Sequence, residues 1–399
     1  MQPPGVDPLL TSLGGKAQLD AGKLNEIEAA IGSAFREHKL PGAAVVLLQN
    51  GQPPLEVTFG LASTQTQTPV TPETLFNWGP LTHSLTSLLA IHLEEAGVVN
   101  LDEPVEEWYR RFRLTDPRAE REVTLRHLLS MTAGIPSYVD EIVDPAWAQP
   151  DDLFQALSQA PVIARPGAIQ EASFLGVAVG GFLLAEREGY PNGDRLEAFE
   201  HLLQSRILLP AGMATARFRQ EAPGAVLAPP HALKDGHYAV ANRWEPARNP
   251  FAPALGLKGS LRDMVAWLKL ELRYGRLPEG RYVAGPSAFR RRWYGPTQAP
   301  GLSARGMGWV FREEGTLDYL YMNGSYDRQR AAVGLVPSFQ LGFSVLTNAD
   351  GEPAKGFVDK VTAAIIRALV DLEAAEAHRQ QLATPPVATQ PPAPGPGSP

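Results

Sequence analysis

Strand-forming segments stand at the two ends of this chain, and their placement constrains the fold more than any other feature. Residues 43–48 form an uninterrupted apolar run followed by Asn50-Gly51, which predicts a buried strand that enters a hairpin turn, with residues 55–61 as the return strand. From 74 to about 267 the pattern is mainly helical. Strand patterns then return in four segments, 308–311, 317–322, 331–336 and 342–346.

Helical patterns lie outside both sets of strands. Apolar residues at helical spacing predict a helix over 24–38, and a closing helix is predicted over about 356–377. We therefore expect an α/β (α+β) fold, in which an antiparallel sheet is flanked by the N- and C-terminal helices and carries an inserted, mainly helical lobe. Long loops are expected within that lobe, around 145–150 and 222–250.

One domain, 22–375, accounts for most of the chain in this interpretation. Residues 384–399 contain seven prolines and little to bury, which predicts a disordered tail of polyproline type. The expected parts are an N-terminal extension (1–21), a sheet lobe (about 22–72 and 300–375), a helical lobe (about 73–299), and a helix end with the proline-rich tail (376–399).

The composition excludes several classes of protein. Lys and Arg number 36 against 43 Asp and Glu, a formal charge of −7, so neither nucleic acid nor an anionic membrane surface is an expected partner. The absence of cysteine excludes thiol catalysis, disulfides and cysteine metal sites. The eight histidines show no metal-binding spacing, so we expect neither a metal nor a cofactor. No apolar run has the length of a membrane span.

The first residues, Met1-Gln-Pro-Pro-Gly, have neither the basic nor the apolar region of a signal peptide. We expect a cytoplasmic protein, or an exported one if the sequence begins after processing.

Several motifs follow one another in an order that resembles a known family. They are Pro41-Gly42-Ala-Ala-Val-Val, Phe76-Asn-Trp-Gly79, Val99-Asn-Leu-Asp102-Glu-Pro104, the run 123–136, Arg165-Pro-Gly167, Gly256-Leu-Lys-Gly-Ser260 and Gly342-Phe-Ser-Val-Leu-Thr-Asn348. The chain resembles the serine β-lactamase and penicillin-binding-protein superfamily, in the branch of class C-like β-lactamases, family VIII esterases and DD-peptidases. The resemblance implies a β-lactamase/transpeptidase-like fold with an active site in the cleft between the two lobes.

The family's first catalytic motif is Ser-x-x-Lys, directly after Phe-x-x-Gly. Positions i and i+3 share a helix face, so the lysine amine can take the proton of the serine hydroxyl. Here Pro80 stands at the serine position and His83 at the lysine position. Proline offers neither a hydroxyl nor an N–H, but it suits the first turn of a helix. We expect His83 to be a half-exposed histidine in the cleft.

The other two motifs depart from the family pattern as well. The family's Tyr-x-Asn, after a Pro-Gly turn, corresponds to Ala172-Ser173-Phe174. Tyr190-Pro191-Asn192 has the spacing of this motif, but the glycines on either side of it predict a turn. The family's Lys-Thr-Gly or His-x-Gly strand motif corresponds to Met322-Asn323-Gly324, and only the glycine is kept.

A relocated nucleophile would need a serine near His83. Ser84 points about 100° away around the helix, and Ser87 shares the face of His83 but lies a turn deeper. Ser325 and Ser260 are further candidates at the cleft edge, although Ser260 with Asp263 fits a helix capping box. The cleft residues expected to contact a ligand are Trp78, His83, Phe174, Asn323, Gly324 and Ser325.

Three functions stay open on this evidence. The first is a pseudoenzyme, a family member that has lost catalysis and uses the cleft to bind or scaffold a peptide or cell-wall-like small ligand. The second is a serine hydrolase, of esterase, β-lactamase or D-peptidase type, that acts on ester or amide substrates with a relocated nucleophile and His83 as the base. The third is a purely structural relative whose cleft is filled by Trp78, Phe174 and Met322.

Overall fold

The structure is a computed structural model that describes residues 18–49, 51–137, 148–189, 194–218, 225–241, 249–294, 306–315 and 317–383. Three features expected from the sequence lie outside the described residues: most of the N-terminal extension, the pattern at 190–192 and the proline-rich tail at 384–399.

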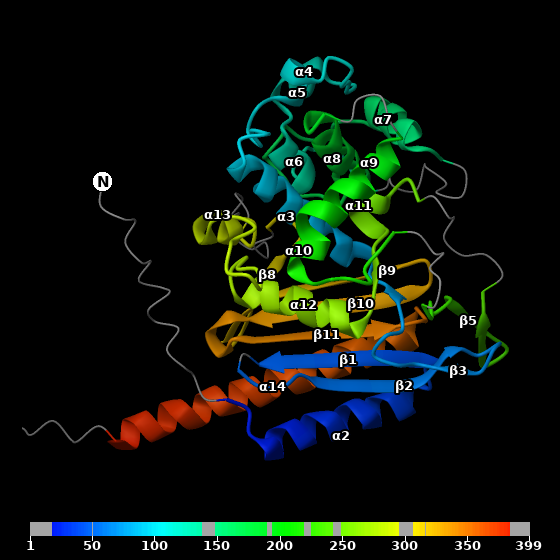
Figure 1. Cartoon of the computed structure of the whole chain (residues 1–399), viewed down its shortest axis with the longest axis vertical. Helices are drawn as coiled ribbons and strands as arrows, with labels where there is room; N and C mark the ends of the chain where they lie inside the picture. Colours follow the sequence, from blue (N-terminus) through cyan, green and yellow to red (C-terminus); the bar gives the residue numbers. More distant parts are fainter. Residues whose placement is uncertain are drawn as a thin grey trace, which may run out of the picture.

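A seven-stranded sheet, antiparallel wherever neighbouring strands pair, forms the base of the molecule (Figure 1). Its strand order is β3-β2-β1-β11-β10-β9-β8, so strands from the two ends of the chain meet at its centre. There β1 pairs with β11, with Val45 opposite Val345. The strands are β1 (Gly42–Gln49), β2 (Leu55–Ser63), β3 (Thr68–Pro69), β8 (Val310–Glu314), β9 (Leu317–Tyr326), β10 (Gln329–Val336) and β11 (Leu341–Thr347).

The terminal helices α2 (Ala21–His38) and α14 (Glu352–Ala383) cover one face of this sheet (Figure 1). Val45 and Leu47 of β1 pack into the cluster formed with these helices. Ala44, Val46 and Leu48 face the helical lobe on the other side. Because β1 is buried on both faces, its sequence is a continuous apolar run rather than an alternating one.

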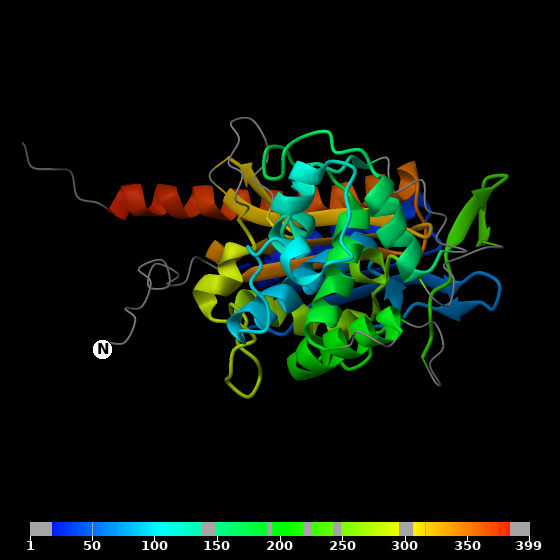
Figure 2. The same cartoon turned by 90° about the horizontal axis from the view of Figure 1, so that it is seen from above.

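Helix α12 (Leu261–Leu272) lies on the opposite face, against β1 and β11. Ser260 and Asp263 form the capping box that begins it, which confirms that prediction. Seen from above, the rest of the helical lobe lies over the sheet, and the end of α14 projects beyond it (Figure 2). That lobe contains α3 (Thr82–Glu95), α4 (Val105–Trp108), α5 (Pro117–Glu122), α6 (Leu125–Leu129), α7 (Pro150–Gln159), α8 (Phe174–Arg187), α9 (Arg195–Leu203), α10 (Leu209–Ala211), α11 (Ala252–Leu255), α13 (Pro286–Arg291), the 3-10 turn η1 (Gly79–Leu81), the π-helical segment η3 (Gln204–Leu208), and the short strands β4 (Phe76–Asn77) and β7 (Lys258–Gly259).

The structure corrects two expectations about these elements. The loop expected at 222–250 contains a hairpin, β5 (His231–Lys234) and β6 (His237–Val240). Its turn at Asp235-Gly236 has positive φ at both residues, as a tight hairpin turn requires. Helix α14 also begins before 356 and ends after 377. None of the described helices combines the length and the apolar character needed to cross a membrane.

Candidate functional site

A cavity of about 140 Å³ lies where η1 and the start of α3 meet β9 and the segment that leads into α8. It brings together the three sequence segments that stand at the family's motif positions. The residues that line it are Pro80, His83, Met131, Gln170, Ala172, Phe174, Gly306, Gly308, Trp309, Val310, Arg312, Tyr321, Met322 and Asn323.

Pro80 occupies the first turn of the helix and contacts the cleft strand closely. It lies in η1, which leads directly into α3, so its missing N–H costs no hydrogen bond. A Cβ added to Gly324 would lie 2.5 Å from Cγ of Pro80. The glycine at 324 therefore allows β9 to approach the proline ring.

His83 is buried rather than half-exposed, which corrects the expectation from the sequence. Only 2% of its surface is accessible, and its Nε2 lies 2.6 Å from the backbone carbonyl of Leu129. A carbonyl can only accept, so Nε2 carries the proton and donates it. The other ring nitrogen, Nδ1, has no hydrogen-bond partner among the described residues. Burial lowers the pKa of His83 from 6.5 to about 4, against the smaller opposing effect of the Leu129 hydrogen bond, so the ring is neutral at pH 7.

We expect His83 to make stability fall in acid. Between pH 4 and 6.5 the unfolded chain binds a proton at this residue and the folded chain does not. The free energy of unfolding therefore rises with pH across that window, and this contribution to stability is lost as the pH falls. The contribution is about 3 kcal/mol between pH 7 and pH 4. His83→Gln keeps an amide donor for Leu129 but cannot titrate. In this variant, denaturant unfolding at several pH values should show a loss of unfolding free energy between pH 7 and pH 4 that is smaller by about 3 kcal/mol than in the wild type.

The matched control for that measurement is His237→Gln, at an exposed histidine of β6. It should leave the pH dependence as in the wild type. An unchanged slope in His83→Gln would contradict the assignment of the acid sensitivity to the buried ring.

The segment at the family's Tyr-x-Asn position begins α8. Ser173 is its N-cap, and its side chain accepts a hydrogen bond from the backbone N–H of Gly176. Ala172 and Phe174 on either side both line the cavity. This stretch thus offers the cavity a methyl group and a phenyl ring, but no phenol or amide.

Strand alternation decides which residues of β9 face the cavity. Met322 packs against the core shared with the helical lobe, whereas Tyr321 packs against the terminal helices on the other face. The Tyr321 hydroxyl lies 3.4 Å from the Thr362 hydroxyl of α14, and the Asn323 amide donates to it at 3.3 Å. Burial also raises the pKa of Tyr321, which keeps the phenol protonated. All three residues of the Tyr321-Met322-Asn323 match contribute to the cavity lining, but the Tyr321 hydroxyl is directed to Thr362 and Asn323.

The serines considered as substitutes do not line the cavity. Ser84 donates its hydroxyl to the carbonyl of Leu81 at 2.9 Å. Ser87 is fully buried in α3, and its hydroxyl has no hydrogen-bond partner in the part of the chain that the structure describes, so it makes no bond to His83. Ser325 is exposed and lies on the same side of β9 as Tyr321. Ser260 caps α12.

Trp78 is also absent from the cavity lining, although the sequence analysis placed it there. Its side chain is fully buried and stacks on Trp267 with ring centroids 5.6 Å apart. Its indole N–H donates to the carbonyl of Gly259 at 3.1 Å. The tryptophan thus joins β4 to the α12 region. Of the three residues expected to fill the cleft, Phe174 and Met322 therefore line the cavity and Trp78 does not.

Sequence reasoning missed several lining residues. Met131 has positive φ after α6, and the Gln170 amide donates to the carbonyl of Ser130 at 2.8 Å. The Arg312 guanidinium lies over the ring of Tyr321, 5.1 Å from its centroid. Gln170 and Arg312 belong to none of the motifs, and Met131 lies in the run 123–136, which gave no indication that its side chain lines the cavity. Among the described residues, no group of three His, Asp or Glu side chains could hold a metal ion.

Residues 24–368 match the sequence model of the beta-lactamase family. The chain is 27% identical over 330 residues to Esterase EstB of Burkholderia gladioli, an alignment that covers 73% of this chain and 80% of that protein. Two solved structures are also similar. The octameric penicillin-binding protein homologue from Pyrococcus abyssi has a TM-score of 0.71 and 22% identity, over 87% of this chain and 77% of that one. The class C beta lactamase from Rhodobacter sphaeroides has a TM-score of 0.70 and 24% identity, over 87% and 99%. These likenesses confirm the expected fold class.

Proposed function

The chain belongs to the beta-lactamase family, and from that premise we propose that it is a pseudoenzyme, a member that has lost acyl transfer and uses the cavity beside Pro80 to bind a small ligand. One observation carries the proposal. Of the described residues that line the cavity, none is Ser, Thr, Cys or Lys. Acyl transfer by this family needs a hydroxyl nucleophile and a group that accepts its proton.

The residues at the motif positions support this proposal chemically. Pro80 has no hydroxyl, and His83 directs its N–H to the Leu129 carbonyl. A histidine with a pKa of about 4 is also a weak base at neutral pH. Catalytic groups that act as a unit lose most of their effect when one is removed, and here all of them are replaced.

The lining indicates the kind of ligand. Most of its side chains are apolar, aromatic or thioether groups, among them Phe174, Met131 and Met322. Gln170 adds an amide, and Arg312 adds a cation. A small, largely apolar ligand fits this set, such as a peptide side chain or a cell-wall-like fragment with a few hydrogen-bonding groups.

The alternative is a serine hydrolase of ester or amide substrates with a relocated nucleophile. The likeness to Esterase EstB favours hydrolysis. The serine nearest in sequence on the face of His83 is Ser87, which is fully buried outside the cavity lining. This alternative therefore requires a rearrangement that brings a serine to the cavity.

Intact mass after incubation with a fluorophosphonate, and separately with a penicillin, tests the proposal. We expect no adduct on a sample whose folding is verified by circular dichroism, while an active class C β-lactamase treated in parallel is fully labelled. A stoichiometric adduct would overturn the pseudoenzyme proposal, and peptide mapping of the adduct would then identify the nucleophile of the alternative.

A further inference from the structure

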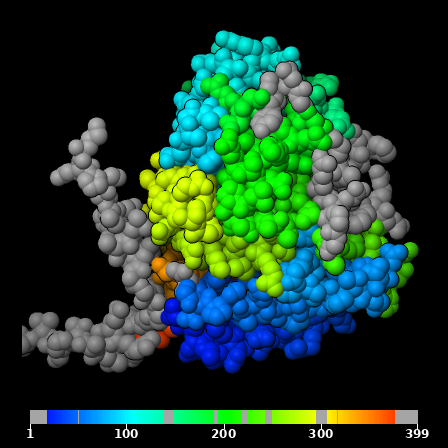
Figure 3. Space-filling view, in the orientation of Figure 1, coloured from blue at the N-terminus to red at the C-terminus, as the bar shows by residue number. Residues whose placement is uncertain are grey.

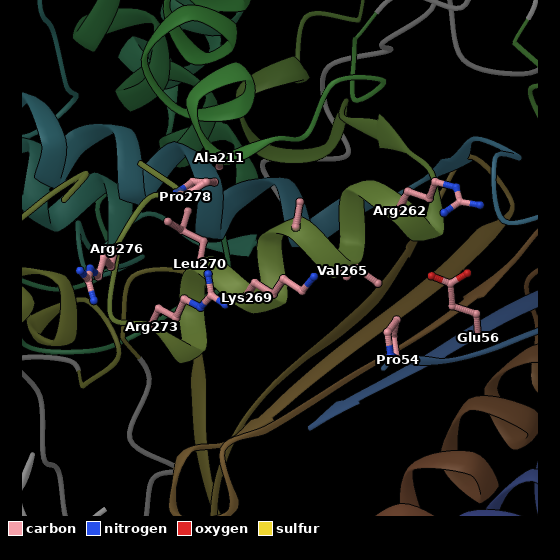
Figure 4. Close-up of a pocket in the computed structure, with 11 residues that line it drawn as sticks. Pro54, Glu56, Ala211, Arg262, Val265, Lys269, Leu270, Arg273, Arg276 and Pro278 are labelled. Carbon is pink, nitrogen blue, oxygen red and sulfur yellow. The ribbon is translucent and has the colours of Figure 1, made fainter. Parts of the chain in front are cut away.

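A second concave site lies on the outer side of α12. None of the described residues that line it belongs to the cavity at Pro80. The groove has a volume of about 390 Å³ and lies between α12 and the start of β2 (Figure 4). In the space-filling view, α12 belongs to the yellow-green surface between the green helical lobe and the blue β1–β2 segment (Figure 3). Its lining residues are Pro54, Glu56, Ala211, Arg262, Val265, Ala266, Lys269, Leu270, Arg273, Arg276 and Pro278.

Four cations line this groove, in a chain whose net charge is −7. Arg262, at one end, is paired with Glu73, 2.8 Å away. Glu56, the only acid among the described residues of the lining, lies at that same end (Figure 4). At the other end, Lys269, Arg273 and Arg276 are exposed and make no ion pair within the described chain.

The arrangement at that end is unfavourable without an anion. Lys269 in the last turn of α12 and Arg273 at its C-cap are spaced i, i+4, where like charges repel. A single cation in the last turn of a helix stabilises the helix dipole. Lys269 and Arg273, with Arg276 beyond the end of the helix and no carboxylate partner in the described chain, exceed that need, and they offer charge-assisted hydrogen bonds to an anionic group.

The floor between the charged ends is apolar. Val265, Ala266 and Leu270 of α12, together with Ala211 and Pro278, line it. Val265 lies one turn of helix, about 6 Å, before Lys269. A ligand whose anionic group binds at Lys269 and Arg273 would therefore place an apolar body along Val265.

We propose that this groove binds a small amphiphilic anion, a phosphate or carboxylate joined to a short apolar body. The groove's volume lies in the range of small-molecule sites. A polyanion or a charged membrane surface would need an extended basic surface, whereas this chain carries an excess of acidic residues. The proposal is independent of what the cavity at Pro80 binds.

Isothermal titration calorimetry of the full chain at low ionic strength tests it, with hexyl phosphate as the probe. Hexyl glucoside supplies the same apolar body without charge, and inorganic phosphate supplies the charge without the body. We expect hexyl phosphate to bind at least tenfold more tightly than either, with an affinity that falls as NaCl is added. Binding should weaken at least tenfold in the double variant Lys269→Gln with Arg273→Gln.

The matched control is Arg110→Gln with Arg111→Gln, which removes the same charge at two exposed arginines of the helical lobe. It should bind hexyl phosphate as the wild type does. No binding of hexyl phosphate would overturn the proposal, as would equal binding by the Lys269 and Arg273 variant. Equal affinity for inorganic phosphate would overturn the role of the apolar floor, and equal affinity for hexyl glucoside the role of the cations. Circular dichroism of both variants verifies that they fold.

Discussion

Arg292→Met is expected to lower the free energy of unfolding by about 3–5 kcal/mol. Arg292 and Glu271 of α12 form an ion pair in which neither side chain has any exposed surface. The carboxylate also accepts the indole N–H of Trp267 at 2.9 Å and of Trp293 at 3.1 Å. Removal of the guanidinium leaves this buried carboxylate without its counter-charge. It also removes a cation from over the ring of Phe289, 4.2 Å from the centroid.

Two variants separate this effect from a loss of side-chain volume. Arg291→Met makes the same substitution at the neighbouring position, where the side chain is 54% exposed, and should change stability by less than about 0.5 kcal/mol. Adding Glu271→Gln to Arg292→Met removes the orphaned charge and keeps one acceptor oxygen for one of the two indoles, so the double variant should be more stable than Arg292→Met alone. Chemical denaturation measures all three. If Arg292→Met lowers the free energy of unfolding no more than Arg291→Met does, the buried ion pair does not stabilise the fold as the structure indicates.

The triple variant Pro80→Ser, His83→Lys and Ala172→Tyr is expected to regain covalent labelling by a fluorophosphonate, on the order of 10²-fold above the wild type. The new hydroxyl oxygen would bond to phosphorus, fluoride would leave, and the amine at position 83 would take the proton. Serine is smaller than proline, so it fits beside Gly324, where the proline ring now lies. The burial of position 83 would lower the pKa of a lysine there, so that more of its amine is unprotonated at neutral pH and able to accept the proton.

The control keeps Pro80 and carries only His83→Lys and Ala172→Tyr. It offers no hydroxyl at position 80 and should remain unlabelled, as measured by intact mass over time. A folded triple variant that stays as inert as this control would show that the cavity has diverged beyond these three positions.

The sheet could be predicted from the sequence because its central strands carry strong local patterns. β1 and β11 are buried on both faces, so β1 contains an uninterrupted apolar run and β11 is mostly apolar, with Ser344 and Thr347 as its polar residues. The hairpin β5–β6 was missed, although Asp235-Gly236 between two short strands is a hairpin signal. The extent of α14 was underestimated because its last turns are polar, and no proline or glycine interrupts them before Pro385.

The site could be predicted only in part, because the motifs fix positions but not their surroundings. The order of the motifs located Pro80, Ala172 and Met322, which the structure brings to one cavity. The burial of His83 depends on α6, whose Leu129 carbonyl reaches it across 46 residues of sequence. The pairing of Glu271 with Arg292 is likewise tertiary, and charged residues in a sequence are ordinarily expected at the surface.

The pairing of β1 with β11 has a consequence for how the protein is made. Val345 follows its partner Val45 by 300 residues. At about 5–20 residues per second, a ribosome needs roughly 15–60 s to add them. During that interval the β1–β2 hairpin has emerged with one apolar strand edge unpaired, and such an edge is prone to pair with other chains. Completion of the sheet must therefore wait until translation is nearly finished, and the nascent hairpin is the segment most in need of a chaperone.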